Sequence, residues 1–348
     1  MMDITAIGLS TAFGTGVAAI QTALADDREA MMLRSDMIGT DFRPLLCVFA
    51  QDSPLAGVAE RVIALIADAL RDLSGHLAAR KIGWPKDAAL VLLTPGADIG
   101  FPEKASAELA TLALSRLREA GWLAHDGQVR LVQGGAGTTA AALRAVAEFT
   151  AAGTPVFLVA ADSHACRHRL GALLEENALF SNASKWGFIP GEAACAVLIE
   201  PARADRGCVA RITGIAEATE PVPERAQKDS AHTGLSDAAL GALQAHGRSG
   251  FALPGQVLTD WNNSRYRAAE FSYALVRLTG LLRPGFVEAE HPAMRFGQCG
   301  AAWFAAVMAW LATDGAGACL VLCGNETDGT RGAFVLCLPE ANAAPVET

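Results

Sequence analysis

Gly137-TTAAALRAVAEFTAAGTPVFLVAAD-Ser163 combines a helix of small residues, a glycine turn and an apolar strand, and it has a counterpart later in the chain. The segment Gly300-AAWFAAVMAWLATDGAGACLVLCGN-Glu326 shows the same order with the same spacing throughout. Each segment begins with a glycine, continues as an alanine-rich helix and reaches a β-rich run after a further glycine. This repetition predicts an internally duplicated α/β protein, although two unrelated helix–strand units can also look alike by chance.

The rest of the chain alternates between strand and helix patterns. Before the first repeat we predict strands over residues 4–10 and 88–94, and helices over residues 17–25, 55–79 and 103–120. This alternation predicts a mostly parallel sheet that helices cover. The opening strand has a counterpart in Val209–Ala216, so we place the two halves at 1–205 and 206–348 within one globular unit. Residues 219–236 are polar and contain proline, which predicts an exposed loop.

The composition is that of a compact, well-buried protein. Hydrophobic residues make up 51% of the 348 residues, charged residues only 19%, and there are 34 glycines. These proportions exclude a disordered or fibrous chain. The net charge of −9, without a run of Lys or Arg, argues against nucleic acid or an anionic membrane surface as the main partner.

No signature of targeting, metal or cofactor is visible. The first residues lack the pattern of a signal peptide, and the apolar stretch Ala301–Ala312 is too short to span a bilayer, so we predict a buried core helix there. The eight cysteines form no CxxC pair, which suits reduced thiols. Gly14-Thr-Gly16 begins a dinucleotide-like loop, but Ala19 stands where its third glycine belongs. We expect a cytoplasmic protein without metal, cofactor or membrane segment.

Three segments resemble the β-ketoacyl-ACP synthases of the thiolase superfamily. Gly187-FIPGEAACAVLI-Glu200 is similar to their GF-x-x-GEGA-x-x-LVLE segment and is the most specific match. Ile4-TAIGLSTAFGTGVAAIQTAL-Ala25 resembles their first strand and helix, and Val132-QGGAGTTAAA-Leu143 resembles the strand end and helix that present the nucleophile. The resemblance implies a thiolase-like α/β fold, with a duplicated core in an α-β-α-β-α arrangement of layers.

The nucleophile of this family is missing. By resemblance, the catalytic cysteine belongs seven residues before Leu143, where this chain has Ala136 between Gly135 and Gly137. In the family the positive end of the buried helix activates the thiol there. Alanine carries no acyl thioester.

The other catalytic positions of the family are also changed. Aligned on Gly300-Ala301-Ala302, the GH-x-x-GAAG element places its histidine on Gly297, beside Gln298. The second family histidine, in an HGTGT loop, falls near Asn262. The glycine-rich GFGG loop keeps glycines such as Gly329 but loses the phenylalanine. Carbon–carbon bond formation needs a nucleophile and donors for the enolate, so we expect no condensation by the family route.

Two residues are weak candidates for other chemistry. The repeat places Cys299 opposite Ala136, before a helix start that would stabilise a thiolate, although a buried inert thiol is the plainer interpretation. His291 lies next to the lost lysine position of the family. Glu288 and Glu290 would raise the pKa of His291 and make it an acid or base, whereas a histidine without chemistry is the alternative.

Polar residues follow two of the predicted strands. A cluster that includes Asp260, Asn262 and Arg267 comes after Val257-Leu258, and strand ends in α/β proteins bind ligands, which makes Asn262 a pocket candidate. Turn formation by Asp and Asn explains the same cluster without a function. Asp162-Ser163-His164 contains the residue types of a triad, but adjacent residues seldom face one another, so we interpret it as a structural strand end.

Two functions remain open. The first is a non-catalytic acyl-binding or adaptor subunit of a bacterial biosynthetic or secretion system. It would resemble chain-length factors, which replace the cysteine and accompany an active synthase. Its partners would be a second copy or a ketosynthase-like subunit, and an acyl carrier protein or acyl-CoA. The second is an enzyme of acyl transfer, thioester hydrolysis or decarboxylation. The predicted pocket-lining residues are Gly135, Gly137, Gln298 and Gly329. An apolar tunnel ending between Ala136, Asn262 and Gly297 would favour acyl binding or catalysis, and a filled pocket would favour an adaptor.

Overall fold

The computed structural model describes residues 1–50, 57–203, 207–226, 228–284, 289–315 and 317–339. Its strands are β1 (Met2–Thr11), β2 (Gly14–Thr15), β3 (Met32–Ile38), β4 (Pro44–Cys47), β5 (Ala89–Pro95), β6 (Val129–Gly134), β7 (Val156–Ser163), β8 (Glu192–Pro201), β9 (Ala210–Thr219), β10 (Gln256–Thr259), β11 (Ala318–Gly324) and β12 (Thr330–Cys337). Its α-helices are α1 (Val17–Ala25), α2 (Val58–Ala79), α3 (Glu103–Glu119), α4 (Thr139–Ala151), α5 (Arg167–Glu175), α6 (Gly234–Gly247), α7 (Arg265–Leu278), α8 (Ala293–Phe296) and α9 (Trp303–Asp314). Short 3-10 helices are η1 (Ala136–Thr138), η2 (Glu224–Ala226), η3 (Thr279–Leu281) and η4 (Gly300–Ala302).

The strands and helices predicted from the sequence are present, with shifted ends. Helix α1 has the predicted ends, and α2 begins at Val58, while its predicted start at residue 55 lies outside the described residues. In each repeat a 3-10 turn, η1 or η4, precedes the α-helix. The loop predicted over 219–236 contains η2 and ends earlier, because α6 begins at Gly234; residue 227 lies outside the described residues.

Ten strands of the described chain form one mixed sheet, in the order β10-β11-β12-β9-β1-β8-β7-β5-β6 with β2 paired to β1. The series β1-β8-β7-β5 and β9-β12-β11-β10 share the same pairing senses: antiparallel, antiparallel, parallel. This correspondence confirms the duplicated α/β core. The prediction of a mostly parallel sheet is wrong. In the second half the reason is the short connection between β11 and β12, which makes them an antiparallel hairpin.

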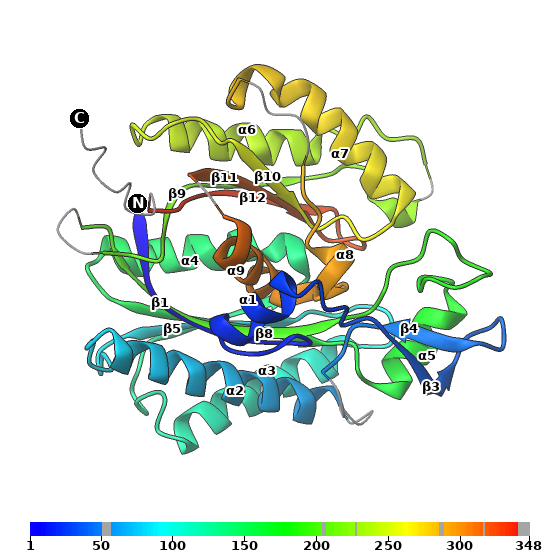
Figure 1. The fold of residues 1–348 in the computed structure, drawn as a ribbon, viewed down its shortest axis with the longest axis horizontal. Coiled ribbons are helices and arrows are strands. Elements are labelled where there is room, and N and C mark those ends of the chain that lie inside the picture. The colour runs from blue at the N-terminus through cyan, green and yellow to red at the C-terminus, as the bar shows by residue number, and fades with distance from the viewer. Residues whose placement is uncertain (51–56, 204–206, 227, 285–288, 316, 340–348) are drawn as a thin grey trace.

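The sheet and its helices form five layers (Figure 1). Helices α2 and α3 cover the outer face of one half of the sheet, α6 and α7 lie over the outer face of the other, and α4 and α9 lie between them. Two glycines permit the close approach of helix to sheet. A Cβ on Gly8 would stand 2.0 Å from the carbonyl oxygen of Ala69 in α2, and one on Gly214 would stand 2.1 Å from that of Ala242 in α6. These equivalent positions confirm the match between the β1 and β9 segments.

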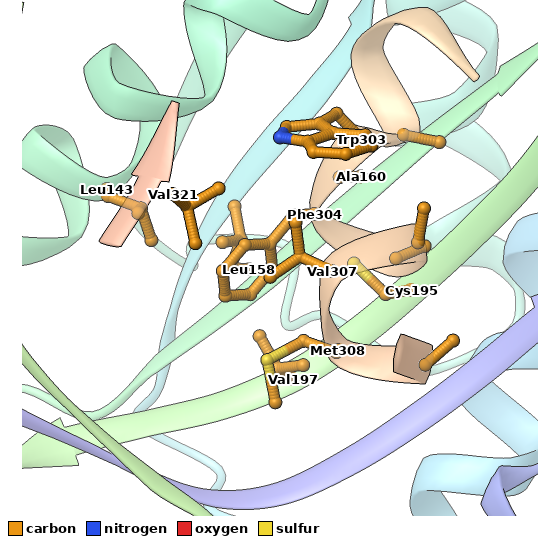
Figure 2. Close-up of a cluster of buried hydrophobic side chains, with 14 of the residues drawn as sticks. Leu143, Leu158, Ala160, Cys195, Val197, Trp303, Phe304, Val307, Met308 and Val321 are labelled. Carbon is orange, nitrogen blue, oxygen red and sulfur yellow. The ribbon is translucent and has the colours of Figure 1, made fainter. Parts of the chain in front are cut away.

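Helix α9 lies at the centre of the largest hydrophobic cluster (Figure 2). Trp303, Phe304 and Met308 are fully buried and pack among strand and α4 side chains such as Leu158 and Leu143. A helix that is apolar on every side belongs in a core, as predicted for residues 301–312. No helix in the described part of the chain is long and apolar enough to cross a bilayer. The predicted division between residues 205 and 206 falls outside the described residues.

Candidate functional site

The site forms where the strand ends of both halves meet. After β6, Gly135 leads into η1 and α4, and the buried Ala136 lines a central cavity of about 70 Å³. Gln298 and Gly300 reach the same cavity from the second half. Its polar and charged lining residues are Asp98, Asp162, His164, Arg169, Arg225, Gln298, Asn325, Glu326, Thr327 and Asp328. We call this space the central cavity; it is small, and its wall is partly polar and partly apolar.

Each half caps the helix start of the other half. Asn325, after β11, accepts a hydrogen bond from the backbone N–H of Gly137 at 2.9 Å through its Oδ1. Asp162, at the end of β7, accepts one from the N–H of Ala301 at 3.0 Å through its Oδ2. The repeat makes Asp162 and Asn325 equivalent. At both helix starts a side-chain oxygen therefore already occupies the place where the positive end of the helix attracts negative charge.

Cys299 lies in this region but faces away from the cavity. Its side chain is fully buried, and its Sγ lies 3.3 Å from the carbonyl oxygen of Phe296 and 3.5 Å from that of Gly297. Burial raises the pKa of the Cys299 thiol above its ordinary value, and the charges of Asp162 and Glu192 raise it further. A thiolate is disfavoured here, because the nearby groups are acceptors and carboxylates.

His291 lies outside the central cavity. Its Nδ1 is 2.7 Å from the Oγ1 of Thr259, and Trp261 and Phe271 meet its ring edge to face. Of the two acidic neighbours that the sequence offers, Glu288 lies outside the described residues. The carboxylate of Glu290 accepts hydrogen bonds from Gln256 and Trp310. His291 is therefore held by packing in a place from which it does not reach the cavity.

Asn262, at one position that the resemblance assigns to a histidine, lies close to Gln298, the neighbour of the other such position, Gly297. Asn262 donates a hydrogen bond from Nδ2 to Oε1 of Glu326 at 3.0 Å, and Gln298 donates from Nε2 to the same oxygen at 3.5 Å. The segment Gly187–Glu200 holds Gln298 in place, since the N–H of Gly191 donates to the backbone carbonyl oxygen of Gln298 at 3.0 Å. Gly297 packs directly against Gly191, where a Cβ would lie 2.9 Å from the Cα of Gly191.

Glu326 supplies a half-buried carboxyl at this point. Desolvation raises its pKa to about 7, and the charges of Glu224 and Asp98 act in the same direction, while the hydrogen bond from Asn262 and the charge of Arg267 oppose them. The resemblance treats this segment only as a loop that lost its phenylalanine, so Glu326 has no role in the sequence-based prediction. Its place directly after β11 is the signal that could have found it, because strand ends position ligand-binding groups.

A network of buried ion pairs lies next to the segment that carries Asn262. Arg267 contacts the carboxylates of Asp260 and Glu270, and Arg331 donates from Nε to Glu270 at 2.5 Å. Asp260 also accepts a hydrogen bond from the N–H of Gly324 at 2.7 Å, which fixes the end of β11. The polar residues after β10 are thus divided: Asp260 and Arg267 are structural, and Asn262 faces the site.

A second, wider space lies outside Glu326. This outer cleft has a volume of about 390 Å³ and shares Ile99, Phe188, Arg225 and Glu326 with the central cavity. Its other lining residues are Glu176, Asn177, Ala178, Ser184, Trp186, Gly187, Glu224, Asn262 and Ser264. Gly137, Gly297 and Gly329 line neither space, whereas Gly135, Ala136 and Gln298 line the central cavity.

Two residues of the Asp162-Ser163-His164 segment also line the central cavity. Asp162 pairs with Arg169 at 2.7 Å, and Nδ1 of His164 lies 3.2 Å from the carbonyl oxygen of Gly191. Burial lowers the pKa of His164 to about 4, and the charge of Arg169 contributes. His164 is therefore neutral near pH 7.

Solved structures similar to this chain include ketosynthases and their complexes. The ishigamide ketosynthase/chain length factor matches with a TM-score of 0.69 at 17% identity, over 97% of this chain and 99% of that chain. A β-ketoacyl synthase from Burkholderia phymatum STM815 matches with a TM-score of 0.69 at 13% identity, over 97% and 99%. The ketosynthase ApeO in complex with its chain length factor ApeC, from Xenorhabdus doucetiae, matches with a TM-score of 0.66 at 12% identity, over 97% and 98%.

The chain has the thiolase-like ketosynthase fold. No protein-family model matches it, and no curated protein matches it significantly. At these identities the likeness shows the fold alone, so the function depends on the residues of the site.

Proposed function

We propose that this ketosynthase-like chain is a non-catalytic subunit that acts by binding a ketosynthase-like partner. The observation that carries the proposal is Ala136, which lines the central cavity from the start of η1. No cysteine or serine lines this cavity within the described residues, and its one hydroxyl belongs to Thr327. A cavity without a strong nucleophile lacks the group that would hold an acyl chain.

The size of the cavity favours a partner role over the storage of an acyl chain. Small-molecule pockets usually measure about 300–1,000 Å³, whereas the central cavity has about 70 Å³. The interior beside it is filled by α9, with Trp303 and Phe304 fully buried (Figure 2). An acyl carrier protein or acyl-CoA then enters the proposal as a ligand of the assembled pair.

The open edge of the sheet is the surface that we assign to the partner. Strand β6 pairs with β5 and stands at the end of the sheet, with no described strand on its other side. Leu131 on this strand is 42% exposed. An exposed strand edge pairs readily with a strand of another chain. Two of the similar structures are named as ketosynthases with a chain length factor, which supports a ketosynthase-like subunit as the partner. Without it, a second copy of the chain would occupy the same edge.

The first test asks whether the chain condenses acyl groups. The purified protein is incubated with acyl- and malonyl-thioesters, and intact mass and released products are measured beside an active ketosynthase. We expect no covalent adduct and no condensed product. A product that disappears in Cys299→Ala would overturn the proposal.

The second test asks whether the partner binds at the edge strand β6. The chain is co-expressed with a ketosynthase from the same organism, and the mass of the complex is measured by light scattering. Leu131→Lys should abolish the complex, because a charge on an edge strand opposes strand addition. Leu112→Lys, at a similarly exposed position on α3, is the matched control and should leave the complex intact. Equal effects of the two changes would contradict the assignment of β6.

A second function, thioester hydrolysis, is favoured by one observation. The pKa of Glu326 near 7 suits a general base at neutral pH. Its carboxylate would take a proton from water while the resulting hydroxide attacks the thioester carbonyl, and the thiol would leave with a proton. Release of free thiol from acetyl-thioesters, lost in Glu326→Gln, would support this function and displace the first.

A further inference from the structure

The region around Glu326 contains more hydrogen-bond acceptors than donors. Asn262 and Gln298 each donate one hydrogen bond from the side-chain amide nitrogen to Oε1 of Glu326. Their own carbonyl oxygens, Oδ1 and Oε1, are buried and have no hydrogen-bond partner within the described residues. Asn262 is 4% exposed and Gln298 8% exposed. A buried polar atom that lacks a partner destabilises the protein by about 1–3 kcal/mol, so such atoms call for an explanation.

Glu224 adds a third acceptor of this kind. Ser264 donates a hydrogen bond to its Oε1 at 2.6 Å, but its Oε2 is buried and has no partner among the described residues. Glu224 and Asn262 line the outer cleft together with Glu326, and Gln298 lines the central cavity, which Glu326 also borders. We call Glu224, Asn262, Gln298 and Glu326 the acceptor cluster.

The charges around the acceptor cluster are mostly negative. Glu224 and Asp98 both act on the carboxyl of Glu326. Of the nearby cations, Arg267 is paired with Asp260 and Glu270. Exposed Arg225 lines both spaces at their border. A phosphate or carboxylate ligand would meet repulsion here, and a cation would be attracted.

We propose that the outer cleft binds a small organic cation through a primary ammonium group, which the acceptor cluster receives. An ammonium group has three N–H donors and no acceptor, which complements the unpaired oxygens of Asn262 and Glu224 beside the carboxyl group of Glu326 in the wall of this cleft. The cleft volume of about 390 Å³ suits a small molecule, and Ile99, Phe188 and Trp186 supply apolar wall for its carbon chain. This inference is independent of the partner proposed above, and its test measures only ligand binding.

The test compares ligands that differ in one property. n-Butylammonium, n-butyltrimethylammonium, potassium ion and butyrate are titrated into the full-length protein at pH 8 by isothermal calorimetry. We expect n-butylammonium to bind, and n-butyltrimethylammonium, which has the same charge but no N–H donor, to bind at least about tenfold more weakly. Butyrate should not bind. Equal affinity for the two organic cations, full competition by potassium, tighter binding of butyrate, or no binding of n-butylammonium would each overturn the proposal.

Two variants locate the site. Glu326→Gln keeps the shape and one acceptor but removes the charge, and it should weaken n-butylammonium binding about tenfold or more. Glu224→Gln provides a second, independent reading if the first variant folds poorly, and circular dichroism checks both. Glu108→Gln, on the exposed face of α3, is the matched control and should bind like the unchanged protein. Unaltered affinity in both site variants would show that the cation binds elsewhere.

Discussion

Replacing Glu326 with glutamine should change how the stability of the protein depends on pH. The pKa of the Glu326 carboxyl is raised from an ordinary 4.5 to about 7, mainly by desolvation. Between these two values the native state keeps a proton that the unfolded chain has released, so the free energy of unfolding falls as pH rises. One pKa unit corresponds to about 1.4 kcal/mol, so the whole interval corresponds to roughly 3 kcal/mol.

Glutamine has nearly the same shape and does not titrate, and it still offers an oxygen to Asn262 and Gln298. Urea unfolding followed by tryptophan fluorescence, at steps from pH 4.5 to 8, measures both proteins. From the lowest to the highest pH, the unchanged protein should lose about 3 kcal/mol more than Glu326→Gln does. Glu108→Gln should follow the unchanged protein throughout. If the difference between the unchanged protein and Glu326→Gln does not vary with pH, Glu326 titrates normally and our account of its burial fails.

Three further changes test the fold and the site. Gly8→Ala should lower the free energy of unfolding by about 1–3 kcal/mol, because the added Cβ meets a backbone oxygen of α2, while Gly75→Ala within α2 meets no atom and should raise it by up to about 1 kcal/mol; urea titration measures both. Glu270→Ala should destabilise by about 3–5 kcal/mol in the same assay, since it leaves the buried Arg331 without a carboxylate and the buried Arg267 with that of Asp260 alone. Ala136→Cys should place a thiol in the wall of the central cavity that iodoacetamide alkylates in the native protein, whereas mass spectrometry should find Cys299 unlabelled; labelling of Cys299 alone would contradict the cavity geometry.

The repeated pattern was enough to predict the fold class, because helix and strand periods and the glycines between them are local properties of the sequence. The β7 and β11 segments and the helices before them follow from it. The direction of the strands did not follow. Whether β8 and β12 run parallel or antiparallel to their neighbours depends on the connections that lead into them, and hydrophobic alternation is the same in both cases.

Less of the site than of the fold could be predicted from the sequence, because the properties of the site come from contacts between segments that are distant in the chain. The helix start beside Cys299 looks suited to a thiolate when taken alone, but Asp162 of the other half already accepts a hydrogen bond from Ala301 there. Glu326 stands in a loop that the family resemblance describes only by what it lost. Its raised pKa comes from desolvation and from the charge of Glu224, while Asn262 donates a hydrogen bond that opposes the shift, and both residues approach from other elements of the fold.

The positions that the resemblance assigns to catalysis also lie at the proposed cation site. Where the resemblance places histidines, this chain has Asn262 and, beside Gly297, Gln298, and both amides donate to Glu326. A cavity wall that had only lost its catalytic groups would be expected to fill with apolar side chains, as the interior around α9 has done. Instead the wall holds a half-buried carboxyl and buried, unpaired acceptors, an arrangement that is unfavourable unless a donor completes it. This contrast within one molecule is the reason to search for a cationic ligand at the acceptor cluster while assigning the partner to the edge of β6.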